Sequence, residues 1–405
     1  MMSVVPMAPF FEEIKEEKIL TMTGNYAVAG AVTQTDPDVI CAFPITPQTQ
    51  SVEGLSDTVN HGRLKAAFVN VESELAAISY ITAAVAAGAR GFTATASQGY
   101  LLMQEGLPMT VGWRAPVYML LSNRAWNAPN LSIWNSWEAT LADHGWNKLF
   151  SENVQETYDS AIMSCRIAEE TLFPTIFCHD GFIISHSAQK FTAIPDEIVR
   201  KFTPRIKRHT IATSKPGTWG GIVTPAYFME QRRAIDVAKR EVPGQIDKIF
   251  KEFGKLTGRN YEQIETTNIE KPKIGIITMG SMCGTIKQWI RKNPDVALIK
   301  IRAYRPFPTE RIRKIVEDSN LEKLIILEKN DALGAPIPQV ASSIAPALYP
   351  LSTLFHSFVL GLGGRDVTDD ELDAVKNKIA KITDMKGDLY TYLAVRETKG
   401  KIEGF

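Results

Sequence analysis

The sequence contains little cysteine and no excess of charge of either sign. Its 405 residues include four cysteines that are far apart and form no Cys-x-x-Cys pair: Cys41, Cys165, Cys178 and Cys283. Iron–sulfur clusters need about four thiolates at close, repeated spacings, and zinc sites need Cys or His ligands a few residues apart. The chain is therefore expected to bind no metal cluster itself, and its thiols are expected to be reduced and buried.

Acidic and basic residues balance at 45 each, so the formal net charge is zero. This balance argues against nucleic acid or an anionic membrane surface as a partner. The longest uncharged apolar stretch, Leu75 to Ala89, is too short and too rich in alanine to span a bilayer. The N-terminal residues lack the basic region and the apolar core of a secretion signal. We expect a cytoplasmic globular protein of roughly two or three domains.

From Gly24 to about Ser185, apolar strands alternate with helical stretches, a pattern typical of a parallel α/β layer. The expected strands are Val39–Pro44, Ala67–Val71, Gly91–Thr95, Val117–Leu121 and Thr175–Cys178. The expected helices between them are Gln48–Leu64, Glu74–Ala89 and Gly99–Met109. We assign residues 20–205 to this first α/β domain.

The segment after Ser185 changes in character. Several prolines precede a strongly charged helical run from Tyr227 to Phe253, and Gly254 and Gly258 end that run. We interpret residues 206–270 as a linker and a helical arm.

A second alternation begins at Lys273 and indicates a smaller α/β domain over residues 271–370. Its expected strands are Ile274–Thr278, Ala297–Arg302 and Lys323–Glu328, and its expected helices are Thr285–Lys292 and Thr309–Ser319. Residues 371–405 are charged and are expected to form a helical tail with a frayed end.

Three polar features follow strands of the first domain, at the positions where open parallel sheets bind ligands. Thr46 precedes Pro47, which fixes its own φ and favours an extended Thr46. Ser97-Gln98-Gly99 is a small polar turn able to present backbone N–H groups, and Asn123-Arg124 follows the fourth strand. Each feature alone is more simply a turn, a connection or a surface salt bridge. Their convergence on one rim favours a ligand site in which Arg124 grips a carboxylate.

Glu74 opens the nearly uncharged, alanine-rich helix that follows the second strand. The helix macrodipole alone favours a glutamate in a first helical turn. However, a helix without charge is expected to be buried against another element or another subunit. A carboxylate at the N-terminus of this helix would be partly desolvated, and the pKa of the carboxylate would be raised. Glu72, two residues earlier, is expected to face solvent.

Other motifs are interpreted as structural. Thr278–Met282 follows a strand and contains a single glycine, which favours a plain connection over a phosphate-binding turn. The rigid run Arg305–Pro308 is expected to set a domain corner. His179-Asp180-Gly181 follows a strand, and a capped strand end is favoured over the lining of a site.

The order of these motifs resembles that of the α subunit of the 2-oxoacid:ferredoxin oxidoreductases. The resemblance spans about Gly24 to Thr368. Its matching stretches are Phe43–Pro47, Glu72–Ala77, Thr93–Gly99, Asn123–Ala125, His179–Phe182, Tyr227–Glu230, Tyr304–Pro308 and Gly361–Thr368. It implies an α/β protein with a thiamine-diphosphate-binding, pyrimidine-type parallel-sheet domain and a smaller transketolase C-terminal-like α/β domain.

The resemblance also implies cofactors and partners. Thiamine diphosphate and Mg²⁺ would be held mainly by a β subunit, which explains why this chain lacks a Gly-Asp-Gly motif with a downstream asparagine. The [4Fe–4S] clusters would lie on partner subunits of the β, γ and δ types. Coenzyme A would collect the acyl group, and ferredoxin, or a nicotinamide through another subunit, would accept the electrons. The complex is expected to be a cytoplasmic dimer of heteromers that works in anaerobic metabolism.

The resemblance assigns roles to the residues described above. Glu74 would be the catalytic residue, in contact with N1′ of the aminopyrimidine ring. The residues that contact the cofactor would be Glu74, Ser97, Gln98 and Gly99. The residues that orient the 2-oxo acid would be Thr46, Asn123 and Arg124. No metal ligand is expected on this chain.

One segment departs from the family pattern. Pyruvate enzymes commonly carry Asp-His-Ser-Asp shortly after the strand-end arginine, whereas this chain carries Ile133–Glu138 without the histidine. Five of the seven tryptophans fall between residues 113 and 146, where they line an aromatic pocket or pack an interface or core. The substrate is therefore pyruvate or a bulkier 2-oxo acid, including an aryl acid such as phenylglyoxylate. A non-oxidative thiamine-dependent decarboxylase or transketolase-like subunit, and a catalytically silent scaffold, remain alternatives.

Overall fold

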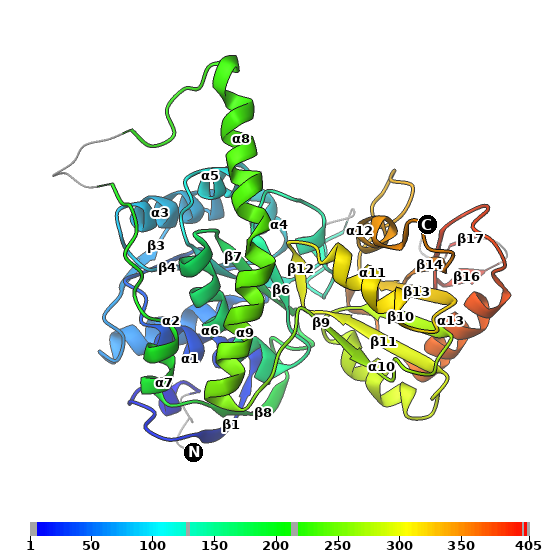
Figure 1. Cartoon of the computed structure of the whole chain (residues 1–405). Helices are drawn as coiled ribbons and strands as arrows, with labels where there is room; N and C mark the ends of the chain where they lie inside the picture. The colour runs from blue at the N-terminus through cyan, green and yellow to red at the C-terminus, as the bar shows by residue number, and fades with distance from the viewer. Residues whose placement is uncertain (1–5, 127–129, 212–217, 399–400, 403–405) are drawn as a thin grey trace.

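A parallel sheet forms the centre of the N-terminal half in the computed structural model, which describes residues 6–126, 130–211, 218–398 and 401–402 (Figure 1). Within these residues the sheet has seven strands in the order β12-β6-β7-β5-β4-β2-β3. The strands are β2 (Val39–Ala42), β3 (Ala67–Asn70), β4 (Gly91–Thr95), β5 (Tyr118–Asn123), β6 (Asn147–Phe150), β7 (Thr175–Asp180) and β12 (Ala303–Arg305). Because β5, β4 and β2 are adjacent and parallel, their carboxyl ends meet at one edge of the sheet.

The sequence predicted β2, β3, β4, β5 and β7 to within two residues at each end, but it did not predict β6. Strand β6 carries Lys148, which is fully buried. Its Nζ donates to the carbonyl oxygen of Ala139 at 2.7 Å, and burial lowers the pKa of Lys148 to about 8. A buried lysine breaks the apolar pattern by which a central strand is predicted.

Helices cover both faces of this sheet. They are α1 (Gly24–Thr35), α2 (Thr49–Asn60), α3 (Glu74–Ala86), α4 (Ser97–Leu102), α5 (Gly106–Gly112), α6 (Val154–Thr171) and α7 (Asp196–Phe202). Short 3-10 turns occupy Ala8–Phe10, Met103–Glu105 and Glu138–Thr140, and β1 (Lys18–Thr23) pairs with β8 (Ala188–Ala193) in a separate antiparallel ribbon. The single helix predicted over residues 99–109 is therefore divided into α4, a 3-10 turn and α5.

Helix α3 is buried on one face only. Ala77, Ile78 and Ile81 are fully buried, and the helix contacts β2 and β4, whereas Tyr80 is 46% exposed. The expectation of a buried helix is thus confirmed for its inner face. The outer face of α3 carries no charged residue between Leu75 and Ala89.

A second sheet lies in the C-terminal part of the chain, with the order β15-β14-β13-β10-β11-β9. Its strands are β9 (Ile264–Thr267), β10 (Ile274–Thr278), β11 (Val296–Ile301), β13 (Lys323–Glu328), β14 (Leu354–Val359) and β15 (Tyr390–Tyr392). The helices are α10 (Met282–Ile290), α11 (Thr309–Glu317), α12 (Gln339–Leu348) and α13 (Asp369–Lys381), with a 3-10 turn at Leu362–Gly364 and a terminal hairpin of β16 (Glu397–Thr398) and β17 (Lys401–Ile402).

The predicted strands and helices of the second domain are all present, but β14 and α12 were not predicted. Helix α12 contains Pro346, and β14 contains His356 and Ser357, which obscure the two patterns. Residues beyond 370 also contribute to this domain. Helix α13 contacts β13 and β14, and β15 adds a parallel strand beside β14, so these residues form more than a helical tail.

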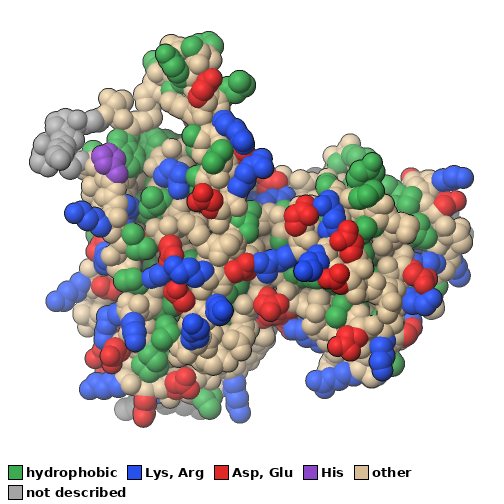
Figure 2. Space-filling model, viewed as in Figure 1, with side chains coloured by type: hydrophobic (Ala, Val, Ile, Leu, Met, Phe, Trp, Pro, Cys, Tyr) green, Lys and Arg blue, Asp and Glu red, His purple; other side chains and the backbone are tan. Residues whose placement is uncertain are grey.

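The helical arm consists of α8 (Pro225–Arg240) and α9 (Val242–Thr257), which extend the predicted run at both ends. Helix α9 packs against α6 and α7, and Gly258, at φ +71°, ends it. Helix α8 has no buried residue along its described length and extends away from the body of the molecule (Figure 1). Figure 2 shows acidic and basic side chains interspersed over the face in view, as expected for a chain without net charge.

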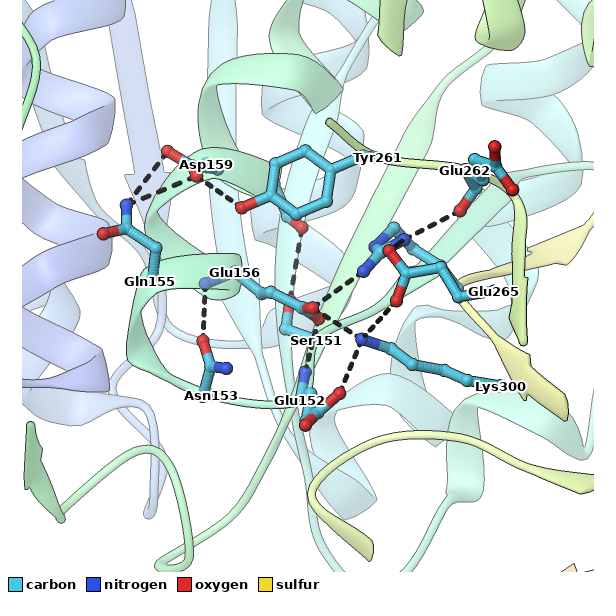
Figure 3. A network of polar contacts seen from close by, with 12 residues as sticks. Ser151, Glu152, Asn153, Gln155, Glu156, Asp159, Tyr261, Glu262, Glu265 and Lys300 are labelled. Carbon is cyan, nitrogen blue, oxygen red and sulfur yellow. Dashed lines mark hydrogen bonds and ion pairs between the residues drawn. The ribbon is translucent and has the colours of Figure 1, made fainter. Parts of the chain in front are cut away.

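Charged side chains of the two domains meet in one network (Figure 3), in which Glu156, Lys300 and Arg302 are almost fully buried. Lys300 on β11 contacts Glu152 Oε2 at 2.7 Å and Glu156 Oε1 at 2.5 Å, and Arg302 contacts Glu156 Oε1 at 2.7 Å. Arg302 also pairs with Glu265 at 2.5 Å. Burial alone would raise the pKa of Glu156, but attraction to Arg302 and Lys300 outweighs it and lowers the pKa to about 2.

Strand β12 is a second link between the domains. It follows β11 of the second sheet and pairs antiparallel with β6 of the first, with Ala303 opposite Leu149. The run Arg305–Pro308, expected to set a domain corner, begins at the end of this strand. Arg305 is held there by Asp143, whose Oδ1 accepts from its Nε at 2.6 Å.

Candidate active site

Glu74 lies at the N-terminus of α3, directly after β3. The Oγ of Ser73 caps the helix by accepting from the Ala76 N–H at 3.2 Å. Glu74 is only 6% exposed, and none of the described basic side chains pairs with it. Burial raises its pKa because desolvation disfavours the charged carboxylate. Glu72 is exposed, as predicted.

Gly99 gives the Glu74 carboxylate its space. A Cβ built on Gly99 would lie 2.4 Å from Glu74 Oε1 and 2.4 Å from Thr95 Oγ1. Any side chain at residue 99 would therefore displace the carboxylate or the end of β4. The sequence placed this glycine in a small turn, but it lies in the first turn of helix α4, and the structure adds a steric reason for it.

The side chain of Ser97 forms its hydrogen bonds within the protein. Its Oγ lies 2.8 Å from the carbonyl oxygen of Ala125 and 2.6 Å from Gln98 Oε1. It thereby connects the end of β4 to the segment that follows β5. A direct contact of Ser97 or Gln98 with a cofactor stays a prediction.

Arg124 and Thr46 meet at the same edge of the sheet. Arg124 Nη1 donates to the carbonyl oxygen of Thr46 at 2.8 Å, and Nε donates to that of Ser132 at 2.8 Å. Arg124 is 5% exposed, and burial lowers the pKa of its guanidinium, although the nearby Glu138 carboxylate opposes that shift. Because Nε is already engaged, a ligand carboxylate would meet the guanidinium end-on, through Nη1 and Nη2.

Several buried polar atoms at this edge have no partner among the described residues. They belong to strand ends or to the segments just after them: Gln48 Oε1, Thr95 Oγ1, and both Asn123 Oδ1 and Asn123 Nδ2. A buried polar group left without a partner costs about 1–3 kcal/mol. Their concentration beside Glu74 and Arg124 therefore indicates a site for a polar ligand. Gln48 and Thr95 were not predicted as site residues, although Thr95 is a polar residue at the end of an apolar strand and Gln48 directly precedes α2.

His179 and Asp180 have structural roles. His179 is fully buried between Ser122 Oγ at 2.6 Å and Thr157 Oγ1 at 3.2 Å, and burial lowers its pKa to about 3. Asp180 Oδ1 accepts from Trp137 Nε1 at 3.1 Å, and Asp180 Oδ2 accepts from the Ser281 N–H at 3.1 Å. Asp180 therefore connects the first domain to Ser281, the residue before α10.

The tryptophans near the site do not form one pocket. Trp137 and Trp146 are fully buried in the core. Trp134 is 49% exposed and packs on Phe182 with ring centroids 4.6 Å apart. Trp126 lines a cavity of about 660 Å³ between the two domains, together with Ser132, Glu138, Asn330 and Leu362.

Two further properties concern the described part of the chain. Within it, no three His, Cys, Asp or Glu side chains are grouped so that they could hold a metal ion. Its helices are also either too short or too polar to cross a bilayer.

Comparison with protein-family models gives two matches. Residues 30–251 match the model described as pyruvate flavodoxin/ferredoxin oxidoreductase, thiamine diphosphate-binding. Residues 273–372 match the pyruvate:ferredoxin oxidoreductase core domain II. The chain belongs to the 2-oxoacid:ferredoxin oxidoreductase family.

Similar curated proteins are subunits of enzymes of this family. The chain is 40% identical over 364 residues to the pyruvate synthase subunit PorA of Pyrococcus furiosus, covering 87% of this chain and 91% of that protein. It is 34% identical over 374 residues to the ketoisovalerate oxidoreductase subunit VorA of Pyrococcus horikoshii, covering 90% and 94%. These relatives identify an α subunit of an oxidoreductase that acts on 2-oxo acids.

Two solved structures show the same fold. The 2-oxoglutarate:ferredoxin oxidoreductase of Magnetococcus marinus has a TM-score of 0.68 at 21% identity, over 90% of this chain and 66% of that one. A split-gene transketolase has a TM-score of 0.52 at 10% identity, over 88% and 97%. The architecture is thus a thiamine-diphosphate-type domain followed by a transketolase C-terminal-like domain, as the sequence predicted.

Proposed function

We propose that this chain is the α subunit of a complex that oxidatively decarboxylates a 2-oxo acid to acyl-CoA and CO₂. The supporting observation is that Glu74, Thr46 and Arg124 follow strands β3, β2 and β5 at one edge of the sheet of a thiamine-diphosphate-binding domain. Among the described residues, the buried Glu74 forms no ion pair with a basic side chain, and the buried Arg124 forms none with a carboxylate. Glu74 is therefore available to a cofactor nitrogen, and Arg124 to a substrate carboxylate.

The residues at this edge fit the aminopyrimidine ring of thiamine diphosphate. Glu74 offers a carboxyl group to a ring nitrogen, and Thr95 offers a buried hydroxyl near it that has no partner among the described residues. When bound, the cofactor supplies the electron sink that a 2-oxo acid needs in order to lose CO₂. We propose that its diphosphate and Mg²⁺ are held mainly by a β-type subunit, since the relatives are named as subunits of larger enzymes.

Glu74 would hold a proton at N1′ of the ring. Burial raises its pKa, so the protonated carboxyl is more easily populated than in a solvent-exposed glutamate. Such a group can both donate and accept the proton shared with the ring nitrogen. Gly99 keeps the carboxyl in place by leaving its Oε1 unobstructed.

Arg124 would bind the carboxylate of the 2-oxo acid through Nη1 and Nη2, with the Thr46 hydroxyl beside it. The pairing is strengthened by burial, because charges attract more strongly where the effective dielectric constant is low. Asn123, adjacent in sequence and fully buried, would supply a further hydrogen bond at this position.

The substrate is proposed to be pyruvate or a bulkier 2-oxo acid, in keeping with relatives named for pyruvate and ketoisovalerate. An aryl acid such as phenylglyoxylate is also proposed for testing, because Trp126 borders the cavity next to Arg124. We further propose coenzyme A as acyl acceptor, [4Fe–4S] clusters on β, γ and δ-type partners, ferredoxin or a nicotinamide as final acceptor, and a dimer of heteromers.

The test is turnover by the purified complex with a viologen dye as electron acceptor. The panel contains pyruvate, 2-oxoglutarate, a branched-chain 2-oxo acid and phenylglyoxylate, each with and without coenzyme A. Coenzyme A-dependent dye reduction with one preferred acid supports the proposal. Dye reduction by none of the acids, in a complex that contains iron and thiamine diphosphate, rejects it. Decarboxylation by a complex without iron would favour a non-oxidative enzyme instead.

A further inference from the structure

The loop of residues 130–140, here termed the substrate loop, determines where Arg124 points. Arg124 Nε donates to the carbonyl oxygen of Ser132 in this loop at 2.8 Å. The next residue, Ala125, donates its N–H to the carbonyl oxygen of Trp134 at 2.9 Å. A displacement of the substrate loop would therefore remove one of the two hydrogen bonds that orient the guanidinium.

The second domain holds the substrate loop at three points. The Trp137 N–H donates to the carbonyl oxygen of Lys329 at 3.0 Å. The Gly363 N–H donates to Ser136 Oγ at 3.0 Å, and the Asn330 amide donates to Thr140 Oγ1. Lys329 and Asn330 directly follow β13, and Gly363 belongs to the turn after β14.

The glycine turn of residues 361–364 also approaches the substrate loop very closely. A Cβ built on Gly364 would lie 2.6 Å from Trp134 Cβ and 3.3 Å from the backbone nitrogen of Asn135. Both atoms are on or next to the backbone, so they cannot rotate away as the end of a long side chain can. By contrast, a Cβ on the neighbouring Gly363 would meet nothing within 4 Å.

Asp180 holds the same loop from the side of the first domain. Its carboxylate accepts from Trp137 Nε1 at 3.1 Å and also binds the Ser281 N–H and hydroxyl and, at 3.4 Å, Lys329 Nζ. Trp137 thus contacts both domains, through its indole and through its backbone. The loop is consequently fixed only when the two domains are docked in this arrangement.

We propose that the second domain positions the substrate-binding arginine, with the glycine turn and Lys329 holding the substrate loop so that Ser132 orients Arg124. This inference rests on the proposed function of Arg124. The second-domain residues act as positioning residues, since the substrate carboxylate would contact Arg124 rather than them. A misplacement of about 1 Å in such a binding group can cost up to about 100-fold in rate or affinity.

The experiment compares Gly364→Ala with Gly363→Ala in the purified complex. Both residues have a positive φ, +78° and +65°, so alanine is strained at either position. Only Gly364→Ala adds the collision with Trp134. We expect Gly364→Ala to raise the KM for the preferred 2-oxo acid about tenfold, with kcat within about twofold and the KM for coenzyme A unchanged. Gly363→Ala adds no collision but strains the turn whose N–H is held by Ser136, so it is expected to raise the KM for the 2-oxo acid no more than about threefold.

A second variant, Ser136→Ala, removes the acceptor of the Gly363 N–H without adding volume. It is expected to raise the same KM about threefold, and it replaces Gly364→Ala if that variant fails to assemble. Equal KM values for the 2-oxo acid in Gly364→Ala and Gly363→Ala, or an unchanged KM in Ser136→Ala, would overturn this inference alone. A wild-type complex that oxidises no 2-oxo acid would overturn the proposed function, and this inference with it.

Discussion

Gly99 and Glu74 are in such close contact that a single methyl group at residue 99 would lie 2.4 Å from the Glu74 carboxylate oxygen. The two residues come from different helices, α4 and α3, so the contact brings the ends of β4 and β3 together around one carboxyl group. This relationship makes the position of Glu74 sensitive to the smallest possible substitution.

Gly99→Ala is therefore expected to lower kcat of the complex at least tenfold, because the Glu74 carboxyl must move. Gly112→Ala is the matched control, since a Cβ there meets nothing within 4 Å and its φ is ordinary. The measurement is dye-coupled turnover together with the thermal midpoint of each variant. Full activity of Gly99→Ala would show that the carboxyl tolerates displacement.

The raised pKa of Glu74 also predicts that the stability of the chain depends on pH. The folded-state pKa of Glu74 is raised above 4.5, so the folded state retains a proton that the unfolded state has lost. This contribution to the free energy of unfolding is fully present below pH 4.5 and is lost as the pH rises through the folded-state pKa. Glu74→Gln is expected to flatten that decline in thermal unfolding of the purified chain between pH 4.5 and 7.5. Glu72→Gln, at an exposed position, should not, and identical profiles for the two variants would contradict the assignment.

Arg124→Lys is expected to raise the KM for the 2-oxo acid about 10- to 100-fold. A lysine ammonium cannot replace the planar fork that reaches the carbonyl oxygens of Thr46 and Ser132 while it binds a carboxylate. Arg208→Lys is the control, because Arg208 binds only the carbonyl oxygens at the end of α3 among the described contacts. An unchanged KM in Arg124→Lys would remove Arg124 from the substrate site.

Glu156→Gln is expected to destabilise the chain by about 3–5 kcal/mol, because it leaves Lys300 and Arg302 partly uncompensated in a buried position. The pKa of Glu156 is lowered to about 2, so its contribution is present above about pH 4.5 and is lost as the pH falls toward 2. Chemical denaturation at pH 7 and pH 3 measures both effects. The exposed Glu310, which pairs with the partly buried Arg313, supplies the control Glu310→Gln, which should change the free energy of unfolding by less than about 1 kcal/mol. A Glu156→Gln variant as stable as this control would argue against an interdomain role for the network.

The local pattern of apolar residues in the sequence predicted much of the fold, because apolar runs of the right length indicate parallel strands. Strands β4, β10 and β13 agree with prediction to the residue. The missed strand β6 contains Lys148, whose charge is accommodated by carbonyl oxygens that follow Glu138 in sequence. No local pattern encodes that compensation.

The sequence likewise predicted some features of the candidate site and missed others. The sequence predicted that Arg124 and Thr46 lie on one edge of the sheet, because the carboxyl ends of parallel strands share an edge, but it did not predict the hydrogen bond that the guanidinium donates to the Thr46 carbonyl oxygen. The contacts of Trp137 with Lys329 and of Ser136 with Gly363 link residues about 190 or more positions apart in the chain. Such contacts depend on how the two domains dock, and hydrophobic periodicity carries no information about docking.

Strand β12 has a consequence for biosynthesis. Strand β12 pairs with β6 of the first sheet, but its residues follow β11 of the second domain in the chain. During synthesis, β6 therefore has an unpaired edge until the ribosome has produced residue 305. An exposed strand edge is a template for pairing with other chains. A nascent N-terminal domain is therefore in its most aggregation-prone state just before the crossover is synthesised. A truncated gene product ending in the helical arm would remain in that state permanently.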